Sequence, residues 1–353
     1  MIPSAVARSD LPAAGAKRGR AARIVAIPVE PEPLIVPWWA LPQEQVPQEP
    51  EAAFLAGAAL NSLDRLVRSQ PVWTGAWRQR LALGCAVAAC RLAGRTENEA
   101  ALRDAWVLRP AGVSEGEAIE ALGPGGSLLS AWRLLASRAP DADTSALAQV
   151  AELLGLAHDS GLEAIAGLVS RRRDSEERQP APFVAATLAG EAMELRPDAE
   201  LLAWWLADLA LAKAMRWPRA VPLFMAQAFA PAFRVEEAAQ SDGMRRKRTR
   251  LRPGADGFRA AFYVALAQGA ADALRLAGEM SRRAARLAEV EPRLRAKGAP
   301  DAIRLLLEDD TVPGTFATKK LSRFASRRLF QRLEGLGAVR ELSGRTAFRL
   351  YGL

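Results

Sequence analysis

The chain has 353 residues and a formal net charge of +8, half of its residues are hydrophobic, and it contains two cysteines and one histidine. No apolar run reaches the ~18–20 residues that a membrane-spanning helix needs, so we expect no membrane segment. So few cysteine and histidine side chains argue against a structural zinc site and a histidine-based triad, and we expect neither a metal nor a cofactor.

Residues 1–49 are expected to form a disordered, proline-rich N-terminal tail. Prolines interrupt the stretch PVEPEPLIVPWWALPQEQVPQEP every few residues and favour extended chain. Trp38 and Trp39 can pin the end of this tail onto the folded part of the protein. The tail contains no apolar leader segment, and the two isolated cysteines, Cys85 and Cys90, suit a reducing compartment, so we expect a cytoplasmic protein.

Residues 50–292 are expected to form a helical domain, because apolar residues recur at helical spacing. The expected helices cover residues 51–70, 72–94, 96–109, 127–138, 144–157, 161–172, 183–195, 198–216, 219–233 and 257–290. The sequence TENE at 96–99 fits a capping box, and the Gly-rich residues 111–126 are expected to form a loop. Trp204 and Trp205 lie at core spacing and should fill the interior.

The segment SDGMRRKRTRLRPGADG, residues 241–257, interrupts these helices with a cluster of positive charge. Arg245, Arg246, Lys247 and Arg248 could hold the phosphate groups of a polyanion. A solvated surface loop is equally compatible with this composition, and both interpretations stay open.

The stretch TENEAALRD brings Glu97, Glu99 and Asp104 into one short segment. Paired carboxylates can serve acid–base chemistry once they are close together and desolvated. Glu99 and Arg103, however, stand four residues apart on the expected helix, which is the spacing of an ordinary surface ion pair. We therefore expect no enzymatic activity.

Residues 293–353 are expected to form a second domain, which holds nearly all of the excess positive charge. This segment contains 13 basic and 6 acidic residues, whereas residues 51–292 contain 30 and 29. Basic charge confined to one module suggests a polyanionic partner.

The pattern of this second domain predicts a winged helix, that is, a helix-turn-helix followed by a β-hairpin. A first helix is expected over 301–310, with Asp301 as its N-cap, and a second helix between Ser322 and Gly337. The sequences AVREL and TAFRLYGL then read as two strands around a Ser-Gly-Arg turn. The predicted fold class is therefore all-α, with a multi-helix body and a C-terminal winged-helix module.

The second helix of this module has one face that suits a DNA groove. Arg323, Arg327 and Gln331 stand at i, i+4 and i+8 within ~12 Å of helix, and Arg328 flanks them. In the major groove, arginine pairs with guanine and glutamine with adenine.

Three further residues are candidates for contacts with the DNA backbone. Ser322 at the start of the helix can donate a hydrogen bond to a phosphate. Arg345 at the hairpin tip and Arg349 on its second strand can reach phosphates or the minor groove.

The run LSRFASRRLFQRLEGLGAVRELSGRTAFRLYGL, residues 321–353, resembles the winged-helix ends of Fic-type bacterial proteins. The positions that match that pattern are Ser322, Leu333, Leu336, Gly337, Gly344 and Arg345. The Fic catalytic signature His-Pro-Phe…Gly-Asn-Gly-Arg is absent, since His158 is followed by Asp and Ser. The resemblance therefore does not imply AMP transfer.

The stretches WRQRLALGCAVAACRLAGRTENEAALRDAW and RPDAELLAWWLAD are similar to a bacterial family catalogued as a domain of unknown function, number 1403 in its series. The similarity covers roughly residues 50–353 and implies a bacterial, cytoplasmic protein without implying a reaction. The short gap between Glu308 and Ser322 contains Pro313 and Gly314, so the scaffold helix of the winged-helix motif is expected to be short.

These observations predict a protein that binds double-stranded DNA through its C-terminal winged helix, as a regulator or a replicon-maintenance factor. The alternative is an interaction protein whose winged helix docks a protein partner or a second copy of the chain. If the protein binds DNA, removing these arginines should weaken DNA binding. If it docks a protein partner, duplex DNA should not compete with that partner.

Overall fold

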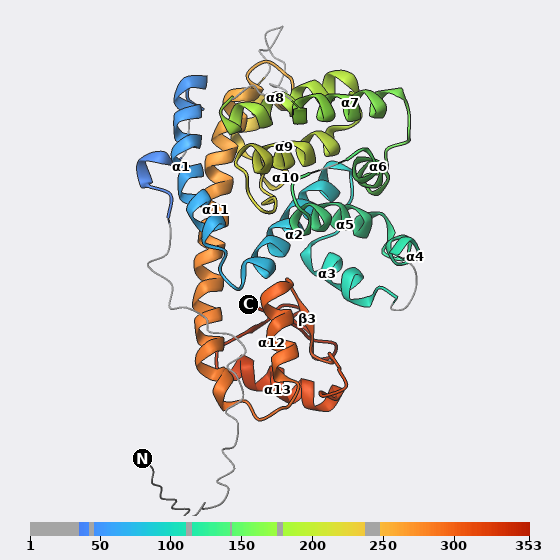
Figure 1. The fold of residues 1–353 in the computed structure, drawn as a ribbon, viewed down its shortest axis with the longest axis vertical. Coiled ribbons are helices and arrows are strands. Elements are labelled where there is room, and N and C mark those ends of the chain that lie inside the picture. The colour runs from blue at the N-terminus through green and yellow to red at the C-terminus, as the bar shows by residue number, and fades with distance from the viewer. Residues whose placement is uncertain (1–34, 42–45, 111–114, 142, 175–178, 237–247) are drawn as a thin grey trace, which may run out of the picture.

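The structure is a computed structural model that describes residues 35–41, 46–110, 115–141, 143–174, 179–236 and 248–353. These segments are mainly helical and end in a small sheet, which confirms the expected helical body and C-terminal hairpin (Figure 1). The helices of the body are α1 (Glu49–Ser69), α2 (Thr74–Leu92), α3 (Glu99–Leu108), α4 (Glu115–Glu120), α5 (Gly123–Ser137), α6 (Thr144–Leu153), α7 (Ser160–Asp174), α8 (Ala181–Leu195), α9 (Glu200–Ala214), α10 (Phe224–Gln227) and α11 (Phe258–Val290). None of the helices in these segments has the length and apolarity that a membrane span requires.

Helix α9 lies at the centre of the body, and it is buried on nearly every side. Its sequence ELLAWWLADLALAKA is apolar all round, which is typical of a central helix. Trp204 packs against Phe233, Phe258 and Phe262, with ring centroids 5.4, 5.7 and 6.4 Å away. The prediction that the two tryptophans fill the interior is confirmed, since Trp205 is buried as well.

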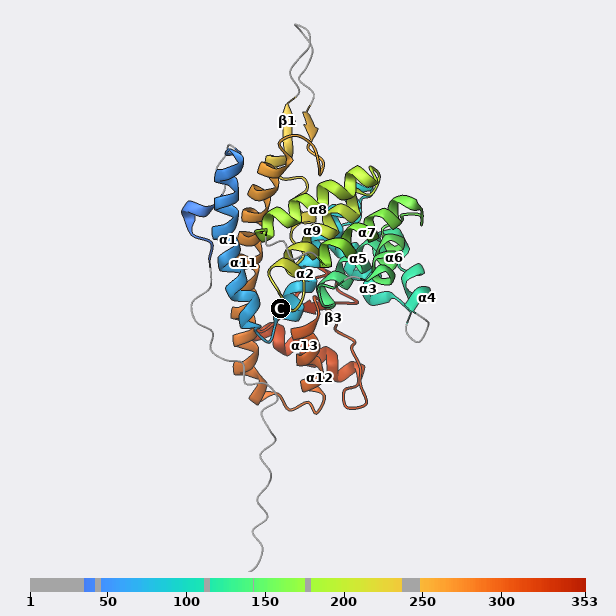
Figure 2. The same cartoon turned by 45° about the horizontal axis from the view of Figure 1, so that its top comes forward.

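Helix α11 joins the body to the C-terminal part of the chain. Its 33 residues span about 50 Å. Its first turns carry Phe258 and Phe262 into the core, and α1 lies beside it in both views (Figures 1 and 2). Its far end reaches the C-terminal elements, where Arg286 Nε donates a hydrogen bond of 3.0 Å to the carbonyl oxygen of Leu336.

Residues 293–353, which we call the C-terminal module, contain two helices and a three-stranded antiparallel sheet. The elements are α12 (Ala299–Glu308), β3 (Val312–Pro313), α13 (Arg323–Gly335), β4 (Arg340–Glu341) and β5 (Leu350–Gly352). Strand β5 lies between β3 and β4, so Tyr351 is paired with Val312 on one side and Glu341 on the other. The ring of Phe330 on α13 stacks on that of Tyr351 at 5.0 Å, which fixes the helix to the sheet.

The body differs from the sequence-based prediction at three places. Within residues 111–126, expected to be a loop, residues 115–120 form α4 and the Gly-rich stretch forms the first turn of α5. Instead of one helix over 219–233 there is only the four-residue α10 and a 3-10 turn, η2 (Pro231–Phe233). The antiparallel pair β1 (Arg234–Glu236) and β2 (Arg248–Arg250) then follows, which the sequence did not predict.

Several helix ends also differ from the prediction. The N-cap of α3 is Asn98, whose side chain accepts from the main-chain N–H of Ala101 at 3.0 Å, so the capping box at 96–99 was wrong. Helix α12 begins after Gly298, and Asp301 lies in its first turn instead of at the N-cap. Both errors shift a helix start by two or three residues: at α3 the capping oxygen comes from a neighbouring polar residue, and at α12 the N-cap is a glycine with no side-chain cap.

Part of the segment expected to be disordered is ordered on α1. The 3-10 turn η1 (Trp38–Ala40) buries Ala40, and the ring of Trp39 stacks on that of Phe54 at 6.0 Å. This contact has the pinning role that the tryptophan pair suggested, although Trp38 itself is exposed.

A further 3-10 turn, η3 (Glu291–Arg293), follows α11.

Candidate nucleic-acid interface

Helix α13 forms between two end signals that the sequence contains. The side chain of Ser322 accepts a hydrogen bond of 3.3 Å from the main-chain N–H of Ala325, which confirms it as the N-cap. Gly337 adopts a φ of +69°, and its N–H donates to the carbonyl oxygen of Glu334, so the helix ends there as predicted. The buried side of the helix is formed by Ser326, Leu329, Phe330 and Leu333.

The opposite side of α13 carries the predicted basic face. Arg323, Arg327, Arg328 and Gln331 are all exposed, and so is Arg332, which the prediction left out. Within the part of the chain that the structure describes, none of these arginines forms an ion pair with a carboxylate. The charge on this face is therefore uncompensated.

Several arginines of the body, unlike those of α13, are paired with carboxylates. The guanidinium of Arg172 lies 2.6 Å from the carboxylate of Glu191, and Arg196 contacts Asp159 at 3.1 Å. Such pairs cancel the local charge, whereas α13 carries four exposed arginines within ten residues that have no carboxylate partner among the described residues.

The two hairpin arginines have partners within the protein. Arg345 forms an ion pair with Asp104 of α3, and Arg349 lies 3.9 Å from the carboxylate of Glu334. The hairpin tip is thus held against α3, whereas the sequence analysis expected Arg345 at its tip to be free to reach phosphates or the minor groove. Both side chains stay partly exposed, so the ion pairs leave part of each guanidinium accessible.

The turn of the hairpin is built by one acidic side chain. Glu341 accepts hydrogen bonds from the N–H groups of Ser343 and Gly344 at 2.7 and 2.8 Å, and another from the Ser343 hydroxyl. Partial burial alone would raise the pKa of Glu341, but these donors hold it below its ordinary value. The turn therefore depends on an ionised carboxylate, and the Ser-Gly pair supplies its donors.

Sequence reasoning missed three lysines beside the start of α13. Lys319 and Lys320 are exposed in the turn before Ser322. The chain at Gly298 lies against this turn so closely that a Cβ there would stand 2.5 Å from the Cβ of Leu321, so Lys297, also exposed and next to Gly298 in the chain, is close to the turn. The dipeptide KK directly before a predicted N-cap was a usable signal, but the approach of residue 297 depends on the fold.

The segment between β3 and α13 holds no helix. The described residues 314–322 form turns that are closed by a bridge between Thr318 and Leu321. Gly314 donates its N–H to the carbonyl oxygen of Arg349 at 2.8 Å, which ties this segment to β5. The scaffold helix, expected to be short, is replaced by turns.

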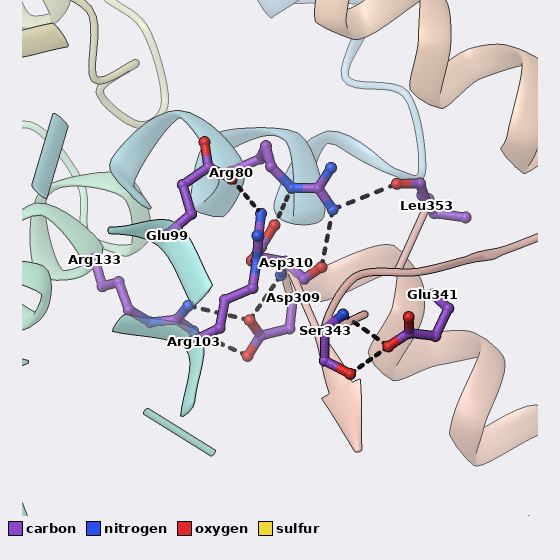
Figure 3. A network of polar contacts seen from close by, with 9 residues as sticks. All are labelled: Arg80, Glu99, Arg103, Arg133, Asp309, Asp310, Glu341, Ser343 and Leu353. Atoms are coloured by element: carbon purple, nitrogen blue, oxygen red, sulfur yellow. Dashed lines mark hydrogen bonds and ion pairs between the residues drawn. The ribbon is translucent and has the colours of Figure 1, made fainter. Parts of the chain in front are cut away.

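A buried ion network fixes the position of the module relative to the body (Figure 3). The Asp310 carboxylate accepts from Arg80 Nε of α2 and, at 2.7 Å, from Arg103 Nε of α3. Next to it, the two oxygens of Asp309 accept from Arg133 of α5 at 3.1 and 2.9 Å. Two consecutive aspartates therefore hold three helices of the body, which sets the direction in which α13 faces.

The burial of Arg103 in this network corrects the interpretation of the Glu99–Arg103 pair as an ordinary surface ion pair. Glu99 and Arg103 do form the expected i,i+4 pair at 3.0 Å, but Arg103 is buried and is not an ordinary surface residue. Burial alone would raise the pKa of Asp310, and the two guanidinium groups hold it below its ordinary value. The carboxylate is therefore ionised in a site that excludes water.

The basic cluster at residues 245–248 gains less support as a phosphate-binding site. Arg245, Arg246 and Lys247 lie outside the described residues, and Arg248 is known only as the first residue of β2. The neighbouring Arg250 is paired with Glu200 at 2.6 Å.

The acidic residues considered for catalysis do not converge. Glu97 pairs with Arg95, Glu99 with Arg103, and Asp104 with Arg345. Each carboxylate has a different arginine partner, so the described residues hold no pair of carboxylates at this place. No group of His, Cys, Asp and Glu suited to a metal ion occurs in the described segments.

Comparison with known proteins places the chain in one family. The family described as "protein of unknown function (DUF1403)" matches residues 29–353. The chain belongs to this family. No curated protein and no solved structure matches it. The resemblance of the C-terminal segment to Fic-type winged helices is not among these findings and stays a prediction.

Proposed function

We propose that this protein binds double-stranded DNA through its C-terminal module, with α13 in the major groove, as a regulator or a replicon-maintenance factor. The observation that carries the proposal is the solvent-exposed row of arginines on α13, none of which has a carboxylate partner among the described residues. A polyanion is the partner that such an uncompensated surface attracts.

The order of elements in the module supports a winged-helix interpretation. Helix α12, strand β3, helix α13 and the strands β4 and β5 follow one another, and β5 lies in the middle of the sheet. In this arrangement α13 corresponds to the recognition helix, and the β4–β5 connection to the wing. Because turns replace the scaffold helix at residues 314–322, α13 is held by the sheet and by α11.

Each group on the surface has a role that its chemistry suits. Arg323 and Arg327 can pair with guanine edges, and Gln331 with adenine. Lys319 and Lys320 are exposed in the turn before α13, at the positive end of its dipole, and their chemistry suits phosphate contacts.

Fluorescence anisotropy with random-sequence duplex DNA tests the proposal. About six phosphate contacts should give a slope of log affinity against log salt near −5. Arg327→Ala should weaken binding by about 1–3 kcal/mol if Arg327 contacts a base. Arg275→Ala is the matched control, because this arginine on α11 is 72 % exposed and its loss changes the net charge equally. No binding at about 50 mM salt, or equal effects of the two substitutions, would contradict the proposal.

One contact favours a second candidate, a module that docks a protein partner. Arg345, expected at DNA phosphates, is paired with Asp104 of the same chain, so the tip of the wing is engaged within the protein and is less free to bind DNA. Under this alternative a partner would bind the module and duplex DNA would not displace it. Removing Arg327 would then have no larger effect than removing Arg275.

A further inference from the structure

Phe324 on α13 is unusually exposed for a phenylalanine. Its side chain is 76 % accessible, whereas Phe330 on the same helix is fully buried against Tyr351. Among the described residues, the one other phenylalanine with a similar exposure is Phe54, at 67 %, and its ring is stacked on Trp39. Phe324 has no ring partner in the described part of the chain.

The neighbours of Phe324 on the helix surface are charged or polar. Arg327 and Arg328 lie three and four residues further on, and Gln331 lies seven residues further on, so all of them share the exposed side with Phe324. Arg323 precedes it directly. The exposed aromatic side chain is thus flanked along α13 by guanidinium and amide groups.

This combination restricts what can cover the ring. A purely apolar partner would have to desolvate the surrounding arginines, which is unfavourable without counter-charges. A ligand that fits must carry negative charge around an apolar group. In the major groove, phosphates flank base edges, and the apolar group among those edges is the C5-methyl of thymine.

We propose that Phe324 contacts the C5-methyl group of thymine, so that the protein prefers an A·T pair at the position facing the start of α13. The placement fits, since residues in the first turn of a recognition helix contact base edges and Phe324 is the second residue of α13. The inference rests on the proposed function and goes beyond it by assigning a base-specific contact to a residue without charge.

The test compares thymine with uracil, which pairs identically and lacks only the methyl group. Duplexes that the full-length protein retains from a random-sequence pool are synthesised with thymine and again with uracil in both strands. We expect the wild-type protein to bind the thymine duplexes about fourfold more tightly, which is the effect of one buried methyl group. Phe324→Ala should bind both duplexes with equal affinity.

Phe54→Ala is the matched control, and it should keep the fourfold preference. Phe324 is exposed, so its substitution should leave the urea midpoint unchanged, and that measurement excludes a folding defect. Equal wild-type affinity for both duplexes, with a normal salt slope, would overturn this inference and leave the proposed function standing. A preference that survives in Phe324→Ala would overturn it as well. If no duplex is retained from the pool, the proposed function fails and the inference fails with it.

Discussion

The substitution Asp310→Asn tests whether buried charge holds the C-terminal module on the body. The side chain of Asp310 is almost completely buried and binds the guanidinium groups of Arg80 and Arg103 through separate oxygens. Asparagine keeps the shape and one acceptor oxygen, but it removes the negative charge. Two buried guanidinium groups then remain with less compensation.

The expected loss can be worked out from these contacts. Removing one partner of a buried ion pair costs about 3–5 kcal/mol, because the remaining charge is desolvated and unpaired. Arg103 keeps Glu99 at 3.0 Å, and Arg80 still donates to the carbonyl oxygens of Asp310 and Leu353 at 3.1 and 3.3 Å. We therefore expect the lower end of the range, a loss of about 3 kcal/mol in the free energy of unfolding.

Urea unfolding followed by circular dichroism measures this loss. The matched control is Glu289→Gln, which neutralises a carboxylate 62 % exposed and 2.6 Å from Arg286. An exposed pair contributes at most about 1 kcal/mol, so the control should change little. If the two substitutions lower the free energy of unfolding by the same small amount, the network does not hold the module, and the reasoning is refuted.

The pH dependence gives an independent check of the same charge. The guanidinium groups hold the pKa of Asp310 in the folded protein below its value in the unfolded chain. The stabilisation is therefore complete above about pH 4 and is lost as the pH falls through the folded pKa. The difference in stability between the wild-type protein and Asp310→Asn should narrow below about pH 4, and a constant difference would contradict the assignment.

Two further predictions follow from contacts of the module. Asp104→Asn should free Arg345 for DNA. The affinity for duplex DNA, measured by fluorescence anisotropy, should then rise about two- to fivefold, which is the range for an exposed ion pair. Unchanged or weaker binding would contradict a role of the wing in DNA binding. Gly352→Ala would place a Cβ 2.5 Å from the carbonyl oxygen of Asp310 and should destabilise the protein by about 1–3 kcal/mol in urea unfolding. Gly57→Ala on α1, where a Cβ meets nothing within 4 Å, is its control and should be neutral or stabilising.

Much of the candidate interface could be predicted because it depends on local interactions. Ser322 caps α13 through a hydrogen bond to a residue three positions away, and Gly337 ends the helix through its own φ angle. The spacing of Arg323, Arg327 and Gln331 on one exposed side follows from helix geometry once the apolar stripe is buried. Such features need no knowledge of distant residues.

The errors lie where local preference competes with tertiary contacts. The apolar stretch at 219–233 has helical spacing, but its chain is bent around the core, and the N–H groups of Leu223 and Phe224 bind Asp208 of α9. Asp208 is fully buried, which raises its pKa, and these N–H groups partly oppose that effect. A carboxylate from a different helix thus starts α10. Pro222 and Pro231 were local signals against one continuous helix over 219–233, but nothing in that stretch indicates the contact with Asp208.

The sequence by itself determined a helical protein whose positive charge is concentrated near the C-terminus, because composition and periodicity fix helix faces through short-range geometry. Only the tertiary structure decided how the charged face is held. Arg80 and Asp310 lie 230 residues apart in the chain, and Arg345 and Asp104 lie 241 apart. Pairs at such separations form only when packing brings the helices together. The sequence around an arginine does not show which carboxylate, if any, will pair with it.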